Sequence, residues 1–287
     1  MTQEWQVMDQ LWRLERPLVM GIVNVTPDSF SDGGRYATCE AAVAHGLALA
    51  AQGADILDIG GESTRPGSLP VPLEEELSRV VPVVEALARQ VTVPISIDTS
   101  KAEVARRCLA AGARIVNDVT ALRGDPEMAA VVREAAAGVI LMHMQGTPAT
   151  MQLNPQYDDV VGEILLFLEK RLQFCDQAGI ARRYVAVDPG IGFGKTAEHN
   201  RTILRRLGEF QRLGRPVCLG ISRKGFLGHW LKRPIERRLA GSLAAACFAM
   251  SQQAVQILRV HDVEETRDAV TVYQALQDGA DKAGAPT

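Results

Sequence analysis

The chain has 287 residues, of which 47% are hydrophobic and 23% charged, a composition typical of globular proteins. Lys and Arg total 31 and Asp and Glu total 34, so the formal net charge is −3, which argues against a nucleic-acid-binding protein. The longest uninterrupted apolar run, Leu243–Met250, is too short to cross a bilayer. We therefore expect neither a nucleic acid nor a membrane as a partner.

The N-terminal segment and the cysteines indicate the compartment. Met1–Pro17 is acidic and has no continuous apolar stretch, so we expect no signal peptide. The chain has five scattered cysteines and no Cys-x-x-Cys pair, which argues against a disulfide framework and against a zinc site. A reducing, cytoplasmic location fits this pattern best.

Eight short apolar runs rich in Val and Ile are each followed by a polar or Gly-rich turn. Near-continuous apolar runs are typical of parallel strands that are covered on both faces. The predicted strands are Leu18–Val25, Ile56–Gly61, Ile95–Ser100, Ile115–Val119, Val139–Met144, Val185–Gly190, Val217–Ser222 and Ile257–Asp262.

Amphipathic stretches of helical period separate these runs. Ser100 is a candidate N-cap for the helix that runs to Ala111, and Asp125-Pro126 has the pattern of an N-cap followed by a first helical residue. The other predicted helices are Cys39–Gln52, Leu73–Gln90, Asp158–Ala178, Ala197–Leu213, Pro234–Gln253 and Val263–Gln277.

Eight strand–helix repeats predict an α/β protein with a single (β/α)8 TIM barrel. No linker or break in composition divides the chain, so we expect one domain over residues 1–287, with a core at about 17–277 and a flexible tail at 278–287. An open doubly wound sheet, with some strands misassigned, is the alternative.

Nearly every predicted strand carries polar side chains at its carboxyl end, where barrels of this kind have their active sites. One buried polar residue can be satisfied internally, but a whole set in register is costly to desolvate without a function. These residues are Asn24, Asp58, Asp98, Asn117, Asp118, His143, Asp188, Ser222, Lys224, Arg259 and His261.

The connections after the first two strands, residues 24–36 and 60–73, are long and rich in Gly, Ser and Pro. Long loops at this end of a barrel are usually binding loops, so we predict a pair of mobile loops over the site rather than two plain solvated connections. A third segment, Asp188–Lys195, holds three glycines but lacks the spacing of a phosphate-binding P-loop. Its glycines would instead allow the backbone to approach a flat ligand closely.

Three further groups suggest the chemistry of the ligand. Arg259 and His261 lie two residues apart on one strand and face the same way, which favours an anion site over a structural ion pair. His143, in an apolar strand, is better explained as a hydrogen-bonded core residue. Lys224 could donate to a ring carbonyl oxygen. The remaining polar groups, Asp98, Asn117 and Asp188, suit the N–H donors of a flat heterocycle such as a 2-amino-4-oxo-pyrimidine.

Several segments resemble, in order, the signature motifs of the dihydropteroate synthase family. The resemblance extends over about residues 17–270, and one position departs from it, Ile191, where Phe is more usual. The matching segments are Gly21–Gly34, Asp58–Gly67, Ser96–Ser100, Asn117–Asp118, Leu141–Gly146, Asp188–Gly190, Ser222–Lys224 and Arg259–His261.

The resemblance implies condensation of 6-hydroxymethyl-7,8-dihydropterin diphosphate with 4-aminobenzoate, by a dissociative path, to give 7,8-dihydropteroate and diphosphate in folate synthesis. It also implies Mg²⁺ as a cofactor, a homodimer, and sulfonamides as mimics of 4-aminobenzoate. A methyltransferase acting on methyltetrahydrofolate is one alternative, but it has no use for a diphosphate site. A catalytically inactive pterin-binding relative is another, although the loop residues that such a protein would have lost are present.

The same resemblance assigns roles to individual positions. The pterin diphosphate would be bound by Thr64, Asp98, Asn117, Asp188, Lys224, Arg259 and His261. The 4-aminobenzoate would be bound by Phe30, Thr64, Arg65, Pro66, Phe193 and Ser222. Asn24 would hold Mg²⁺, and Asp32, Asp98 and Lys224 would act in catalysis.

Overall fold

The computed structural model describes residues 3–26 and 34–282. Its main sheet has eight parallel strands in the order β8-β7-β6-β5-β4-β3-β10-β9. A β-bridge between Val187 and Val217 brings β8 beside β9, so the sheet forms a nearly closed barrel and the predicted TIM barrel is confirmed. The strands are β3 (Leu18–Asn24), β4 (Ile56–Gly60), β5 (Ile95–Asp98), β6 (Ile115–Asp118), β7 (Gly138–Met142), β8 (Val185–Asp188), β9 (Cys218–Gly220) and β10 (Ile257–Val260).

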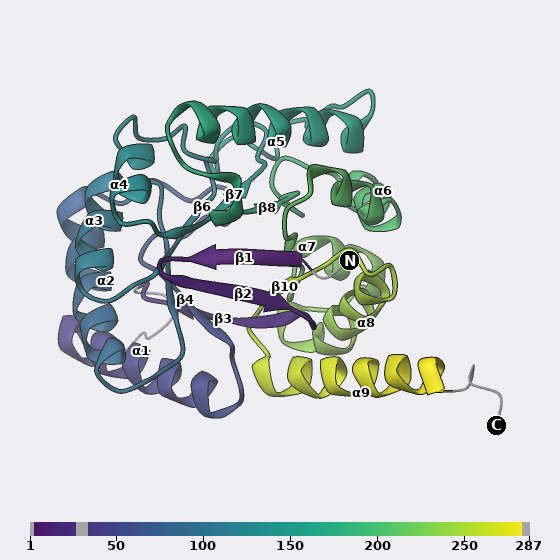
Figure 1. The fold of residues 1–287 in the computed structure, drawn as a ribbon, viewed down its shortest axis with the longest axis horizontal. Coiled ribbons are helices and arrows are strands. Elements are labelled where there is room, and N and C mark those ends of the chain that lie inside the picture. Colours follow the sequence, from purple (N-terminus) through teal and green to yellow (C-terminus); the bar gives the residue numbers. More distant parts are fainter. Residues whose placement is uncertain (1–2, 27–33, 283–287) are drawn as a thin grey trace.

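Helices surround the barrel (Figure 1). They are α1 (Gly34–Ala51), α2 (Leu73–Ala88), α3 (Ala102–Ala110), α4 (Met128–Glu134), α5 (Val160–Gln177), α6 (Ala197–Arg205), α7 (Gly225–Leu231), α8 (Leu239–Ser251) and α9 (Val263–Lys282). Within residues 3–26 and 34–282, no helix combines the length and apolar character needed to span a bilayer.

Several helix boundaries differ from the prediction. The segment predicted as one helix over Ala197–Leu213 divides into α6 and a 3-10 turn at Leu207–Leu213. The short helix α7 was not predicted, because two of its seven residues are glycines, which are poor helix formers. At the C-terminus, α9 continues five residues beyond the predicted end at Gln277, and residues 283–287 of the predicted tail lie outside the described residues.

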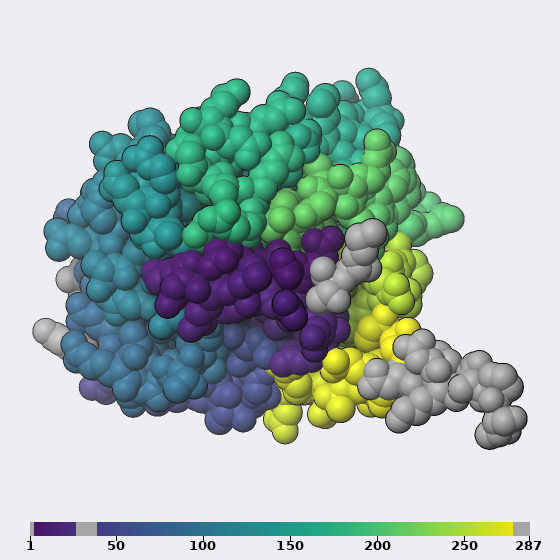
Figure 2. All heavy atoms as spheres, in the orientation of Figure 1, coloured from purple at the N-terminus to yellow at the C-terminus, as the bar shows by residue number. Residues whose placement is uncertain are grey.

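An N-terminal hairpin, which is absent from the predicted elements, covers the amino-terminal end of the barrel. Strands β1 (Gln3–Val7) and β2 (Gln10–Leu14) pair antiparallel and lie across the middle of the ring of helices in Figure 1. In the space-filling view the hairpin fills the centre of this face (Figure 2). The fully buried Trp5 packs with the innermost barrel residues and donates from Nε1 to the Tyr184 carbonyl oxygen at 2.8 Å. The packed core therefore begins before the predicted bound at residue 17.

Two predicted helix caps are also wrong. Helix α3 has Lys101, not Ser100, at its N-cap position, and the N-cap of α4 is Glu127, two residues after Asp125. The carboxylate of Asp125 instead accepts hydrogen bonds from the Ala102 and Glu127 backbone N–H groups, both at 2.9 Å. A side chain after β6 thus satisfies an unpaired N–H of the preceding helix, which local sequence pattern does not reveal.

Inside the barrel, apolar side chains fill the amino-terminal half and polar ones replace them toward the carboxyl ends. The apolar layer includes Met20, Ile56, Ile115, Ile140 and Ile257. On three of these strands the next side chain that points into the barrel, two residues further along, lies closer to the carboxyl end. These side chains are Ile22, Asp58 and Asn117. Strand register then sets Asp98 beside both Gly60 and Asn117, and Met142 beside Asp188.

Candidate active site

An open cavity of about 610 Å³ lies at the carboxyl ends of the strands, with a smaller inner pocket adjoining it. The larger cavity has the size and position expected for the ligand site of a TIM barrel. Residues that line both hollows are Thr64, Asp98, Phe193, Gly220, Lys224 and Arg259.

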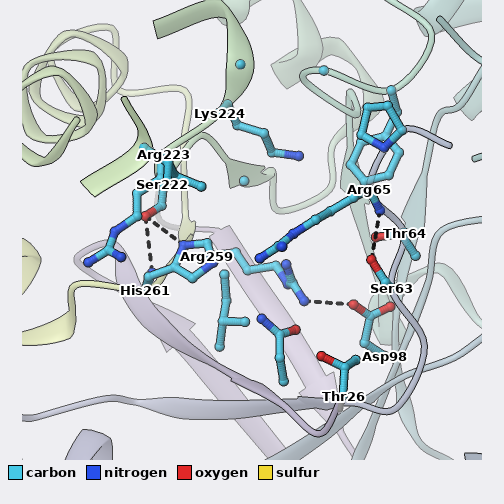
Figure 3. Close-up of a pocket in the computed structure, with 18 of the residues that line it drawn as sticks. Thr26, Ser63, Thr64, Arg65, Asp98, Ser222, Arg223, Lys224, Arg259 and His261 are labelled. Atoms are coloured by element: carbon cyan, nitrogen blue, oxygen red, sulfur yellow. Dashed lines mark hydrogen bonds and ion pairs between the residues drawn. The ribbon is translucent and has the colours of Figure 1, made fainter. Parts of the chain in front are cut away.

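Every described residue to which the family resemblance assigns a binding, catalytic or metal-holding role lines one or both hollows. Of the other polar strand residues singled out in the sequence, Asp58, Asp118 and His143 line neither. The outer cavity also contains Asn24, Arg65, Pro66, Ser222 and His261, and the inner pocket also contains Asn117 and Asp188. Phe30 and Asp32 lie outside the described residues. Figure 3 shows the side chains of Arg65, Lys224 and Arg259 reaching toward one another from three sides of the cavity.

The carboxylates of the inner pocket are strongly desolvated. Burial raises the pKa of Asp98 to about 7, although the neighbouring Arg259 opposes the rise. Burial likewise raises the pKa of Asp188, whose Oδ1 accepts a hydrogen bond from the Gly190 backbone N–H at 2.6 Å. A desolvated carboxylate gains most from a ligand that supplies N–H donors, so both residues are suited to such a ligand.

Arg259 forms two ion pairs at the floor of the cavity. Its Nε donates to Asp58 Oδ2 at 2.6 Å and its Nη2 donates to Asp98 Oδ2 at 2.7 Å. The second contact is drawn in Figure 3. The structural ion pair, which the sequence pattern made the less favoured interpretation, is therefore present. It uses two of the guanidinium nitrogens, and the Arg259 side chain remains 20% exposed.

Lys224 follows β9 and lies beside the inner pocket. Its Nζ lies 4.2 Å from the centroid of the Phe193 ring, a cation–π contact. Burial lowers the pKa of Lys224 to about 8, an effect that Asp188 partly opposes. The ammonium group therefore stands among carboxylates and an aromatic ring, where it can donate to a ligand oxygen.

His261 is a neutral hydrogen-bonding group in this environment. Burial lowers its pKa to about 4, with Arg259 adding to the effect. Its Nδ1 lies 3.0 Å from Ser222 Oγ, and Ser222 Oγ also accepts from the His261 backbone N–H at 3.2 Å. Where Ser222 Oγ gives its proton to Nδ1, Nδ1 is the acceptor and Nε2 carries the ring proton.

The second predicted loop, residues 60–73, is residues 61–72 in the structure, between β4 and α2, and it is held by hydrogen bonds at several points. Lys101 Nζ contacts Glu62 Oε2 and Glu76 Oε2, each at 2.5 Å, and Gly67 N donates to the Pro148 carbonyl oxygen at 3.0 Å. Within the loop, Ser68 Oγ contacts Ser63 Oγ at 2.9 Å. These contacts hold the segment that carries Thr64 and Arg65 over the cavity, and the predicted mobility of this loop stays a prediction.

Two of the three glycines of Asp188–Lys195, Gly190 and Gly194, make room for the backbone that follows β7, while Gly190 and Gly192 also line the inner pocket and the outer cavity. A Cβ on Gly190 would lie 1.9 Å from the His143 carbonyl oxygen, and one on Gly194 would lie 2.5 Å from the Gln145 carbonyl oxygen. Lys195, which is 3% exposed, stabilises this contact. Its Nζ forms hydrogen bonds with His143 Nδ1 at 3.0 Å and with the Phe193 carbonyl oxygen at 2.9 Å. His143 is thus the hydrogen-bonded core residue that was predicted.

Some residues that line the two hollows are absent from the predicted site. The period of two that places Ile140 in the barrel also places Met142 in the inner pocket, and this residue could have been found. The rim residues Met151, Gln152 and Arg238 come from connections distant in sequence, and no local pattern marks them.

The described residues offer few ligands for a metal ion. Within residues 3–26 and 34–282, no three His, Cys, Asp or Glu side chains converge on one point. Asn24, at the end of β3, lines the cavity and offers one amide oxygen. Mg²⁺ keeps several waters and is commonly bound by carboxylates together with substrate phosphates, so a single amide oxygen fits only an ion that is held mainly by diphosphate and water.

Comparisons with known proteins agree with this geometry. A family model described as pterin binding enzyme matches residues 20–261. The dihydropteroate synthase of Escherichia coli K12 is 48% identical over 262 residues, which cover 91% of this chain and 92% of that protein.

Two solved structures of Xanthomonas albilineans dihydropteroate synthase are similar over nearly the whole chain. One, with 4-aminobenzoic acid, has a TM-score of 0.91 and 49% identity, and covers 100% of both chains. The other, in complex with 7,8-dihydropteroate, has a TM-score of 0.87 and 47% identity, and covers 99% of this chain and 100% of that chain.

Proposed function

Because the chain belongs to the dihydropteroate synthase family of pterin-binding enzymes, we propose that it joins 6-hydroxymethyl-7,8-dihydropterin diphosphate to 4-aminobenzoate. The products are 7,8-dihydropteroate and diphosphate. The observation that carries this proposal is the meeting of Asp98, Asn117, Asp188 and Lys224 in one inner pocket that opens into a larger, cation-lined cavity.

The inner pocket would bind the pterin ring. Asp188 would accept hydrogen bonds from the 2-amino group and N3, Asn117 would bind the same edge, and Asp98 would face N8. Lys224 would donate to the ring carbonyl oxygen. Each pairing joins a ring donor to a desolvated acceptor or a ring acceptor to a desolvated donor, which is where hydrogen bonds are strongest.

The outer cavity would bind the diphosphate. Arg259 would offer its remaining nitrogen, Nη1, and neutral His261 would donate from Nε2. Asn24 would hold Mg²⁺ together with the diphosphate oxygens, and Thr64 would contact the same substrate. When bound, the ion neutralises charge that develops on the leaving group.

The reaction would begin with cleavage of the bond between the pterin methylene carbon and the diphosphate oxygen, with the electron pair leaving on oxygen. The resulting methylene cation is conjugated with the dihydropterin ring. Asp98 would stabilise its charge near N8. Asp32 of the first loop, which lies outside the described residues, would stabilise the same charge. A dissociative path suits a weak amine nucleophile in a pocket that excludes water.

The 4-aminobenzoate would then attack the methylene carbon through its amine. Thr64, Arg65 and Pro66 of the second loop would bind it, with Phe193 and Ser222 on the opposite wall and Phe30 from the first loop. The carbon–nitrogen bond forms as the cation is consumed, and the departing diphosphate can take the proton that the amine releases.

We also propose that the chain forms a homodimer, as the family resemblance implies. The half-exposed apolar side chains of Trp230, Leu231 and Phe248 on α7 and α8 are surface that a second copy could cover. Light scattering of the purified chain tests this state. The predicted cytoplasmic location remains a prediction that cell fractionation would test.

One assay tests the proposed activity. The purified chain is incubated with both substrates and Mg²⁺, and 7,8-dihydropteroate is measured by mass spectrometry, with Asp188→Asn as the matched control that should form product more slowly. We expect product only with both substrates. Methyl transfer from methyltetrahydrofolate instead would favour the methyltransferase alternative, and pterin binding without turnover would favour an inactive relative.

A further inference from the structure

Asp58 lies beneath the cavity floor and makes no contact with the space that a ligand would fill. It belongs to β4, is completely buried, and lines neither the outer cavity nor the inner pocket. Any effect of Asp58 on the reaction must therefore pass through the side chains that it contacts.

One oxygen of Asp58 bonds to two residues that reach the ligand space. Oδ2 accepts from Arg259 Nε at 2.6 Å and from Asn117 Nδ2 at 3.1 Å. Arg259 is on β10 and Asn117 is on β6, and each of these strands is the second neighbour of β4, one on either side. A single buried atom thus links opposite walls of the site.

The chemistry of this contact fixes the direction of the Asn117 amide. An ionised carboxylate only accepts hydrogen bonds, so the amide nitrogen must face Asp58. The amide oxygen and the second N–H then face the inner pocket, where Asn117 is one of the lining residues. The same oxygen of Asp58 holds Nε of Arg259, and Asp98 holds Nη2. Within the described part of the chain, Nη1 has no hydrogen-bond partner and remains for an anion.

A comparison within the same strand region argues against a purely structural role. Asp55, next to the amino-terminal end of β4, bonds with both oxygens, to Arg16, to Arg267 and to the Val19 backbone N–H. In Asp58 only Oδ2 is bonded, and Oδ1 is buried without a partner among the described residues. A half-satisfied buried carboxylate is a poor stabiliser, because the cost of desolvation is only partly recovered.

We infer that Asp58 is a positioning residue that orients the Asn117 amide toward the pterin ring and the Arg259 guanidinium toward the diphosphate. The inference rests on the proposed function, since it names the ligand groups that the two side chains meet. Asp58 itself touches neither substrate. It acts on the ring site and on the anion site together, because both depend on the same carboxylate oxygen.

The test is a pair of double-mutant cycles read by calorimetry. Asp58→Asn is combined with Asn117→Ala and titrated with 6-hydroxymethyl-7,8-dihydropterin, and it is combined with Arg259→Ala and titrated with inorganic diphosphate plus Mg²⁺. We expect Asp58→Asn alone to lower the affinity for each ligand by about fivefold or more, which corresponds to the loss of one hydrogen bond. In the background of Asn117→Ala or Arg259→Ala, adding Asp58→Asn should lower the affinity by less than about twofold, because the side chain that Asp58 orients is already missing.

The matched control is Asp55→Asn, which removes a buried, arginine-paired carboxylate at the other end of β4. It should lower the melting temperature and leave both affinities within about twofold. Affinities of Asp58→Asn within twofold of the unaltered chain, or losses that add fully in the double variants, would overturn the positioning role.

A second measurement keeps Asp58 unaltered, so it does not depend on whether Asp58→Asn folds. In the ligand-free, unaltered chain, the side-chain amide of Asn117 is observed by ¹⁵N NMR and assigned by its disappearance in Asn117→Ala. We expect one of its two protons to be protected from solvent exchange before any ligand is added. Rapid exchange of both protons would contradict the contact. A chain that binds no pterin would refute the proposed function, and the NMR result would still decide the orientation of the amide.

Discussion

Arg259 and Asp98 form an ion pair across the mouth of the barrel, with 2.7 Å between Nη2 and Oδ2, although 161 residues separate them in the chain. In the proposed reaction one of them faces the leaving diphosphate and the other faces the cation that remains. Each residue therefore neutralises the other before the substrate binds. When the substrate separates into an anion and a cation, Arg259 already lies near the anion and Asp98 near the cation.

The first prediction concerns pH. Asp98 must be ionised to stabilise a cation, and burial raises its pKa to about 7, so kcat/KM should rise as the pH increases through about 7. Lys224 must be protonated to donate, and burial lowers its pKa to about 8, so kcat/KM should fall as the pH increases further. The profile should be a narrow bell whose limbs belong to the interacting pair. Steady-state rates in Asp98→Asn should lack the rising limb; a flat profile in the unaltered enzyme would contradict these assignments.

A second prediction separates ring binding from folding. Asp188→Asn keeps the shape of the side chain but replaces a charged acceptor by an amide, so the affinity for free dihydropterin should fall by about 1.5–3 kcal/mol. The melting temperature should not fall, because burial raises the pKa of Asp188 and thereby disfavours its charged form in the folded chain. Calorimetry and thermal unfolding of one sample give both quantities. Unchanged pterin affinity would remove Asp188 from the ring site.

The third prediction concerns the anion site. Arg259→Ala should weaken binding of the diphosphate ester more than binding of free dihydropterin, because the guanidinium faces the anion. It should also destabilise the fold by about 3–5 kcal/mol, since Asp58 and Asp98 lose a shared buried cation. Arg267→Ala is the matched control: it removes an arginine from Asp55 and should cost stability without selective loss of the ester. Equal losses for ester and free pterin in Arg259→Ala would assign this residue to structure alone.

The fourth prediction concerns the order of binding. The cavity of about 610 Å³ is large for 4-aminobenzoate, and the side chains that would hold it lie on separate segments, at Arg65, Phe193 and Ser222. Pterin and diphosphate should fill the rest of the cavity and complete the site, so they should tighten 4-aminobenzoate binding, and the coupling should be reciprocal. Titrations of 4-aminobenzoate with and without dihydropterin, diphosphate and Mg²⁺ measure it. Equally tight binding in both conditions would mean a preformed site.

The fifth prediction tests why the chain has glycine at position 190. Gly190→Ala would set a Cβ 1.9 Å from the His143 carbonyl oxygen, with a φ of +69°, so it should lower the free energy of unfolding by about 4 kcal/mol or more. Gly214→Ala has a similar φ of +62° but no atom within 4 Å of the added carbon, so it should cost only about 1–2 kcal/mol. Denaturant unfolding compares the two variants. Similar losses would show that backbone conformation, rather than the contact with β7, requires the glycine.

The eight barrel strands were predictable from sequence because each is buried on both faces and must be apolar along its length. The same rule marked the exceptions, since a polar residue such as Asp98 or Asp188 at the end of such a run needs a partner or a ligand. Barrel topology then brings these ends together, and the described residues with predicted binding or catalytic roles line adjoining hollows.

Other features depend on contacts between segments that are distant in the chain, and no local pattern encodes them. The hairpin around Trp5 is stable only because the open end of the barrel is there to cover, and Asp125 caps a helix that precedes it by more than twenty residues. Sequence alone determined that Asp58 and Arg259 are polar residues on two strands of the barrel. Tertiary structure decided that they share a hydrogen bond, because the distance between two side chains across a barrel is set by strand order and register, not by separation along the chain.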